Sequence, residues 1–152
     1  MANIQDKVLK IALKISEISY TLGEPVVVSV TLTNLSREII IINKRMGINP
    51  GDMVEGTWEI KFDISFPPGE RNIIGTLINR GKPQRNDFTE LSPGENINRD
   101  YILTNYYWIQ LPGKYSVQTT YHNSSYGSMF DLQAWVGEIT SNKVHFFVKA
   151  NV

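Results

Sequence analysis

Apolar and polar residues alternate in several separate stretches of this chain, and this period of two restricts its fold more than any other feature. The stretches cover residues 9–15, 26–34, 58–66, 115–121 and 144–148. Such alternation predicts β-strands with one buried face and one solvated face. No stretch of about ten residues shows the period of 3.6 that an amphipathic helix needs. Short strands separated by turn signals, without crossover helices, predict an all-β antiparallel sandwich or barrel.

The length of 152 residues predicts one domain, spanning residues 1–152, that can bury a core without disulfides. The chain contains no cysteine, which excludes disulfides, thiol catalysis and thiolate metal sites. A simple immunoglobulin-type sandwich needs only about 100 residues. The surplus is expected in extended loops or an extra hairpin, at residues 43–56, at residues 67–90 and after Tyr121. The sequence leaves open how residues 67–90 join the sheets.

Charge and hydropathy bear on the partners and the compartment. Fifteen basic and fifteen acidic side chains cancel, so the chain lacks the positive field on which non-specific nucleic-acid binding relies. The N-terminal stretch carries charges at Asp6, Lys7, Lys10 and Lys14, and it therefore lacks the apolar run of a signal peptide. Nowhere do about 18 apolar residues follow one another, so no membrane span is expected. These features predict a cytoplasmic protein, and secretion stays open if a leader was removed.

The segment LPGKYSVQTTY, residues 111–121, places a tight turn directly before a strand that begins and ends with Tyr. Pro112 and Gly113 force the bend, and we expect Leu111 to fill the core and the Tyr115 hydroxyl to bond back across the bend, as in a tyrosine corner. An aromatic platform for a ligand is the alternative for this segment, and the structural role is the better interpretation. Trp58 is likewise expected to face the core, at the start of the strand TWEIKFDISF.

Several motifs along the chain resemble a family of bacterial immunoglobulin-like sandwich domains that are broadly similar to fibronectin type III domains. They are LKISEISYTLGEPVVVSVTLTN (13–34), LSPGE (91–95), LPGKYSVQTTY (111–121) and WVGEITSNKVHFFV (135–148). The resemblance leaves residues 43–90 uncovered. It implies an immunoglobulin-like antiparallel β-sandwich that serves as an accessory module on unrelated proteins. Some similar domains are intracellular proteinase inhibitors, although no inhibitor motif can be matched here residue by residue.

Two loops carry the candidate binding residues. The loop after Tyr121 sets aromatic residues among Ser, Gly and Asn, a mixture that is typical of recognition surfaces. In immunoglobulin-type sandwiches this connection lies beside the loop that here begins near residue 44. The candidate residues of the two loops are Tyr126, Met129, Phe130, Trp135, Arg45 and Met46. Trp135 also has a structural interpretation, in which it packs over the last hairpin.

We therefore expect a non-catalytic module that binds a protein partner through its end loops. A proteinase inhibitor-like domain is one alternative. Carbohydrate recognition by exposed Trp or Tyr rings is another. The run Ile39–Ile42 could form half of a homo-oligomer interface, because apolar strand edges are normally covered.

Catalysis and metal binding have little support in the sequence. His122 and His145 lack the spacing of a zinc site, and no segment resembles a nucleophile elbow. Asp52 and Glu55 are too few and too irregularly placed for a calcium loop. The basic stretch 71–86 contains no aromatic residue that could stack on single-stranded nucleic acid. We expect no enzyme activity, no metal and no cofactor.

Overall fold

The computed structural model describes residues 8–48, 58–65, 83–124 and 130–151. These residues form ten strands and two short 3-10 helices, which confirms the all-β prediction. The strands are β1 (Leu9–Ile15), β2 (Ser19–Thr21), β3 (Val27–Asn34), β4 (Ile40–Asn43), β5 (Ile60–Ser65), β6 (Phe88–Leu91), β7 (Asn96–Ile102), β8 (Gly113–Asn123), β9 (Gly137–Thr140) and β10 (Val144–Lys149). The 3-10 helices are η1 (Arg85–Asp87) and η2 (Leu103–Asn105). No helix among the described residues is both long enough and apolar enough to cross a membrane.

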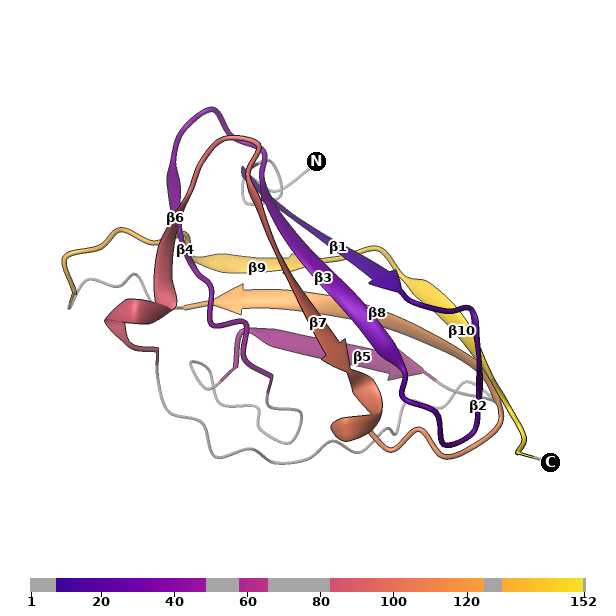
Figure 1. The fold of residues 1–152 in the computed structure, drawn as a ribbon. Coiled ribbons are helices and arrows are strands. Elements are labelled where there is room, and N and C mark those ends of the chain that lie inside the picture. The colour runs from indigo at the N-terminus through magenta and orange to yellow at the C-terminus, as the bar shows by residue number, and fades with distance from the viewer. Residues whose placement is uncertain (1–7, 49–57, 66–82, 125–129, 152) are drawn as a thin grey trace.

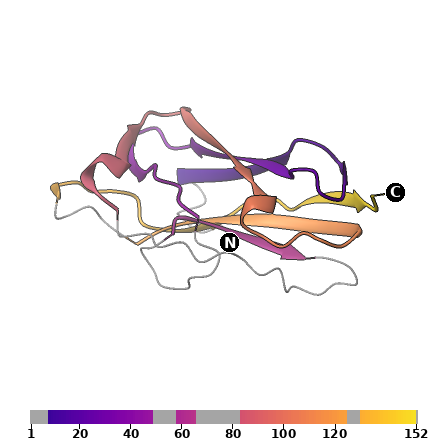
Figure 2. The ribbon, with the colours of Figure 1, turned by 60° about the horizontal axis from the view of Figure 1, so that its bottom comes forward.

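Two larger sheets face each other as the layers of a β-sandwich (Figure 1). One sheet has the strand order β1-β3-β7, and the other has the order β2-β10-β8-β5 with β9 also paired to β8. Figure 2 shows the two layers edge-on, with β1, β3 and β7 above β5 and β8. β4 and β6 form a separate two-stranded sheet at one end (Figure 1). The pairings between the named strands are antiparallel except β2 with β10, which run parallel. Two isolated bridges, Ile41 with Ala134 and Ile48 with Ile60, are also parallel.

The core lies between the two larger sheets and is filled by the alternating side chains that the sequence predicts. Along β3, Val28, Val30 and Leu32 are buried while the residues between them are half-buried. β8 presents Tyr115 and Tyr121 to the core, and both are at most 1% exposed. Truncating a buried aliphatic side chain of this kind to Ala destabilises a protein by about 2–5 kcal/mol. The buried side chains of the two sheets therefore contribute much of the stability of the sandwich.

The tyrosine corner forms at Tyr115, although not every residue of the turn lies as expected. The Tyr115 hydroxyl donates to the Leu111 carbonyl over 2.7 Å, and the ring stacks on Phe146 with 5.1 Å between centroids. Burial raises the pKa of Tyr115, and the hydrogen bond to Leu111 partly offsets this. Gly113 has a φ of 145°, which favours glycine. The expectation that Leu111 fills the core is wrong, because its side chain is 54% exposed and the hydroxyl binds its backbone instead.

The alternation predicted for residues 58–66 breaks at its start. The amides of Glu59 and Ile60 both donate to the Gly47 carbonyl, over 2.9 Å each, so two successive residues face the same way. Glu59 is consequently 1% exposed where the pattern places it in solvent. Trp58 is half-buried and lies over His122, with 5.2 Å between ring centroids. From Ile60 onwards the strand alternates as predicted.

β4 is occupied on both sides, which bears on the predicted oligomer interface at Ile39–Ile42. It pairs with β6 on one side, and on the other the Trp135 amide donates to the Ile41 carbonyl over 2.7 Å. Ile42 is fully buried, whereas Ile39 is 58% exposed. At Ile41 the strand therefore has no free edge for a second chain. Its apolar run serves mainly to attach β4 to the rest of the sandwich.

Candidate functional site

A buried ion pair holds the segment that connects β4 to β5. Arg45 donates from Nε to Glu59 Oε1 over 2.8 Å and from Nη2 to Glu59 Oε2 over 2.6 Å. The Gly47 amide donates to the same Oε1 over 2.8 Å. The two charged side chains are 12% and 2% exposed, respectively. Arg45 therefore has an internal partner, which disfavours a role in contacting a ligand, and its place in a binding surface stays a prediction.

Met46 is also part of the internal structure. Its side chain is 2% exposed, and its carbonyl accepts a hydrogen bond from the Tyr101 hydroxyl over 2.6 Å. The neighbouring Arg45 carbonyl accepts from Arg99 Nη1 over 2.5 Å. β7 thus fixes the backbone of this loop through two side chains. The loop turns the Met46 side chain into the core, which disfavours the predicted role of Met46 in a binding surface.

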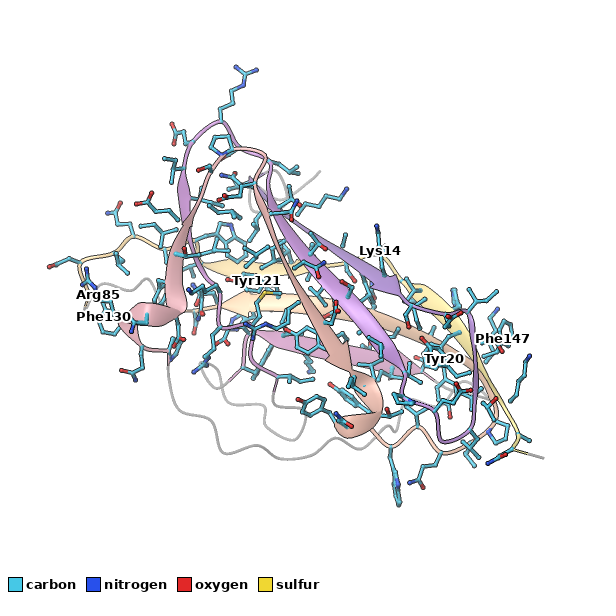
Figure 3. All side chains as sticks on the ribbon, viewed as in Figure 1. Lys14, Tyr20, Arg85, Tyr121, Phe130 and Phe147 are labelled. Carbon is cyan, nitrogen blue, oxygen red and sulfur yellow. The ribbon has the colours of Figure 1, made fainter. Side chains whose placement is uncertain are left out.

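Trp135 packs against the core next to Tyr121. The two rings lie 5.6 Å apart at an angle of 31°, and the Asn123 side chain donates to the Trp135 carbonyl over 2.7 Å. The Tyr121 hydroxyl donates to the Asn43 carbonyl over 2.8 Å, in the interior of the sandwich (Figure 3). Burial and the nearby Glu59 carboxylate raise the pKa of Tyr121 far above its usual range. These contacts favour the structural interpretation of Trp135 over the binding interpretation.

A groove opens at the same end of the molecule, between the β4–β6 pair and the segment that follows Phe130. Ile41, Phe88 and Leu132 contribute apolar side chains, and Lys44 and Arg85 add two cations. Its volume is about 590 Å³, which falls within the range of sites that hold a small ligand or an anchoring side chain. We call this feature the β4–β6 groove.

Phe130, one of the binding residues predicted from the sequence, contacts two residues that line the β4–β6 groove. Its ring lies 6.3 Å from that of Phe88, and its carbonyl accepts from Arg85 Nη1 over 2.8 Å. Figure 3 shows Arg85 and Phe130 side by side at this end of the sandwich. The hydrogen bond holds the Arg85 side chain beside the groove. Phe130 is half-buried, so it lines the end surface without projecting from it.

The two cations of the β4–β6 groove have no carboxylate partner within the described residues. Lys44 and Arg85 are both exposed. Glu90 lines the same groove and lies opposite Ile41 in the strand register, so the lining carries one acid against two bases. The groove can therefore accept an apolar group that has an anionic group beside it.

A second hollow lies at the other end of the sandwich, beside Trp108. The indole of Trp108 is 60% exposed, and the hollow next to it has a volume of about 410 Å³. Tyr107, its neighbour, is buried and accepts a hydrogen bond from the Phe62 amide over 3.3 Å. Two successive residues after η2 therefore differ: Tyr107 packs in the core, whereas the indole of Trp108 faces solvent.

Some of the residues considered in the sequence analysis lie outside the part of the chain that the structure describes. Tyr126 and Met129, and the predicted loop acids Asp52 and Glu55, lie outside the described residues. Within the described residues, no group of three or more His, Asp or Glu side chains is arranged to hold a metal. His122 lies under Trp58, with a buried Nδ1 that has no hydrogen-bond partner.

The class of protein defined by these features is an all-β sandwich with a filled core and a hollow at each end. No protein-family model matches the chain, and no curated protein matches it significantly. The resemblance to immunoglobulin-like domains thus depends on the motifs and the strand order alone.

Proposed function

We propose that this protein is an immunoglobulin-like, non-catalytic module that binds a protein partner at the β4–β6 groove. The strand order supports the immunoglobulin-like assignment. In that fold, strands A, B and E face strands G, F and C. Here β1-β3-β7 faces β10-β8-β5 in the same chain order, and β2 continues the first strand into the opposite sheet.

The observation that carries the binding proposal is the composition of the β4–β6 groove. Its apolar side chains come from β4, from β6 and from the segment after Phe130, and within the described residues its two cations have no carboxylate partner. A groove of this kind suits an apolar anchor from a partner, which would displace water from Ile41, Phe88 and Leu132. An acidic group next to that anchor would meet Lys44 and Arg85.

The apolar side chains and the two cations of the groove should contribute to partner binding in different ways. The apolar anchor should supply most of the affinity, because well-packed and desolvated contacts dominate protein interfaces. Lys44 and Arg85 are exposed, so they should act mainly on the association rate and its dependence on salt. Weak binding at high ionic strength with an unchanged dissociation rate is the expected signature of these two cations.

Affinity capture from an extract of the source cells tests the proposal. The bait is compared with two groove variants, Lys44→Glu and Leu132→Asp, and with Lys114→Glu, a matched charge reversal on an exposed lysine of β8. A specific protein should be retained by the unmodified bait and by Lys114→Glu and should be lost with both groove variants. Equal retention on all four baits would contradict the assignment to this surface.

Carbohydrate binding is the second candidate, and the exposed indole of Trp108 beside its hollow favours it. Aromatic rings exposed next to a hollow can stack on the apolar faces of sugars. Titration with glycans should then change the Trp fluorescence of the protein, and Trp108→Ala should abolish the change. Stoichiometric loss of a protease's activity would instead indicate the proteinase inhibitor alternative.

A further inference from the structure

We propose that the β4–β6 groove accepts an extended segment of its protein partner, with two apolar side chains two positions apart and an acidic side chain two positions beyond the second. The second apolar side chain occupies the groove, and the first occupies a smaller hollow that adjoins it. This inference rests on the proposed function, because it states which kind of partner segment the same site accepts.

The smaller hollow shares Ile41 with the β4–β6 groove, and we call it the Ile39 hollow. It has a volume of about 380 Å³ and is lined by Ile39, Ile40, Ile41, Gln133, Ala134 and Trp135. The two features also meet on the other chain segment, because Leu132 lines the groove and the next residue, Gln133, lines the hollow. The groove and the Ile39 hollow therefore form one surface that a single partner segment can cover.

The wall of the Ile39 hollow is attached to the core of the sandwich. The Trp135 amide donates to the Ile41 carbonyl over 2.7 Å, and Asn123 Nδ2 donates to the Trp135 carbonyl over 2.7 Å. Ala134 forms a parallel bridge with Ile41. Ile39 is 58% exposed, so an apolar side chain can reach it from solvent. A site whose walls are fixed before the partner arrives lowers the entropic cost of binding.

Charge distinguishes the groove from the Ile39 hollow. Lys44 and Arg85 line the groove against one acid, Glu90, whereas no charged side chain is among the residues that line the hollow. The hydrogen bond from Arg85 to the Phe130 carbonyl holds one of the two cations in place. An acidic side chain of the partner is therefore favoured at the groove, and an uncharged apolar side chain is favoured at the hollow. The charges thus set the order of the three partner side chains along the surface.

The spacing of the partner side chains follows from the extended backbone at β4. Ile39 directly precedes β4 and lies two positions from Ile41, so the two side chains share a face and repeat after about 6.6 Å. Alternate side chains of an extended peptide repeat at the same distance. At Ile41, β4 is bonded to β6 on one side and to Trp135 on the other, so the peptide binds through its side chains and not as an added strand.

NMR titration with short capped peptides tests this spacing. The probes are the pentapeptide leucine-serine-leucine-serine-glutamate and its reversed sequence, because the surface sets the order of the side chains and not the direction of the chain. Each probe has two controls: an isomer with adjacent leucines, and a single-anchor peptide in which serine replaces the leucine farther from glutamate. One probe should bind about 10-fold more tightly than both of its controls, because only the probe buries two leucine side chains. It should shift the signals of Ile39 and Ala134, and its single-anchor control should not.

A matched pair of variants assigns the additional affinity to the Ile39 hollow. Ile39→Asp changes a residue that lines the hollow and not the groove, and Ile18→Asp makes the same change at an isoleucine that lines neither. The two isoleucines are 58% and 74% exposed, so both variants should fold. Ile39→Asp should weaken binding of the probe by about 10-fold and should not change binding of the single-anchor peptide. Ile18→Asp should change neither affinity.

The outcomes separate this inference from the proposed function. If the single-anchor peptide binds at the groove as tightly as the probe, the two-anchor spacing is wrong while the groove remains a binding site. If none of the peptides binds, this inference is overturned, and the affinity capture from cell extract decides the proposed function separately. Signals of Ile39 and Ala134 that shift with protein concentration alone would place a second copy of the chain in the hollow, which would also overturn the inference.

Discussion

Removal of the Arg45 guanidinium would reveal how far one buried ion pair secures the end of this sandwich. Arg45 supplies two of the three hydrogen bonds that the Glu59 carboxylate accepts, and the Gly47 amide supplies the third. In Arg45→Ala only the Gly47 amide would remain. Because Glu59 is 1% exposed, water cannot replace the lost donors unless the loop opens. The carboxylate would be left buried and largely uncompensated.

The magnitude follows from the burial of the pair. Removing one partner of a buried ion pair destabilises a protein by about 3–5 kcal/mol, whereas an exposed pair contributes about 0.2–1 kcal/mol. With 12% and 2% of the two side chains exposed, this pair belongs to the buried class. For a domain of this length, each 1 kcal/mol corresponds to about 2–4 °C in melting temperature. Arg45→Ala should therefore lower the melting temperature by about 6–20 °C.

Urea unfolding of matched variants provides the assay. Lys44→Ala removes an exposed cation from the adjacent position and should change the free energy of unfolding by no more than about 0.5 kcal/mol. The double variant Arg45→Leu/Glu59→Leu leaves no unpaired charge and should recover most of the lost stability. If Arg45→Ala loses less than about 1 kcal/mol, or if the double variant is less stable than the single one, the reasoning about this pair is refuted.

Three further predictions concern the tyrosines and one asparagine. Burial raises the pKa values of Tyr107 and Tyr121 in the folded state. Their contribution to the free energy of unfolding is therefore complete below about pH 10, the pKa of an unfolded tyrosine. Above that pH the free energy of unfolding should fall by about 1.4 kcal/mol per pH unit for each of the two groups. Urea titrations between pH 9 and 11 measure this dependence of the unfolding free energy on pH, and Tyr121→Phe should make it shallower. An unchanged slope in Tyr121→Phe would contradict the raised pKa of Tyr121. Tyr115→Phe should lower the free energy of unfolding by about 1 kcal/mol, because the turn before it loses a hydroxyl donor; no change would mean that the bond contributes nothing. Asn142→Ala should lose about 1–3 kcal/mol and speed hydrogen exchange at the Leu13 amide, and unchanged exchange would show that β1 is held by other contacts.

The sandwich layers could be predicted from the sequence because the signal for them is local. A strand such as β3 records its buried face in its own residues, as the alternation of Val28, Val30 and Leu32 shows. The turn at Pro112 and Gly113 likewise predicts the buried Tyr115, which follows it within a few residues. Period and turn chemistry are short-range properties, so a single sequence contains them in full.

The candidate site was harder to predict, because hydrogen bonds between residues far apart in the sequence determine which of its side chains are buried. Arg45 meets Glu59 from 14 residues away, and Tyr101 reaches the Met46 carbonyl from 55 residues away. A loop position next to Gly and Pro suggests exposure, and nothing local in the sequence indicates that Arg45 has a buried acid to bind. The β4–β6 groove has the same character, since Ile41, Arg85 and Leu132 come from three distant segments. Of its residues, only the neighbourhood of Phe130 was indicated by composition.

The buried ion pair and the β4–β6 groove share one stretch of backbone, so stability and binding should be coupled in a specific way. The Lys44 amide donates to the Asp87 carbonyl over 2.7 Å, which closes the β4–β6 ladder, and the next residue is the anchored Arg45. Arg45 is not among the residues that line the groove, yet its loss should let Lys44 shift and weaken partner binding along with folding. Leu132→Asp should weaken binding while leaving the free energy of unfolding nearly unchanged, because the half-buried Leu132 is not part of the core cluster. If Arg45→Ala bound the partner as tightly as the unmodified protein, the groove would have to be held by β6 and Phe130 alone.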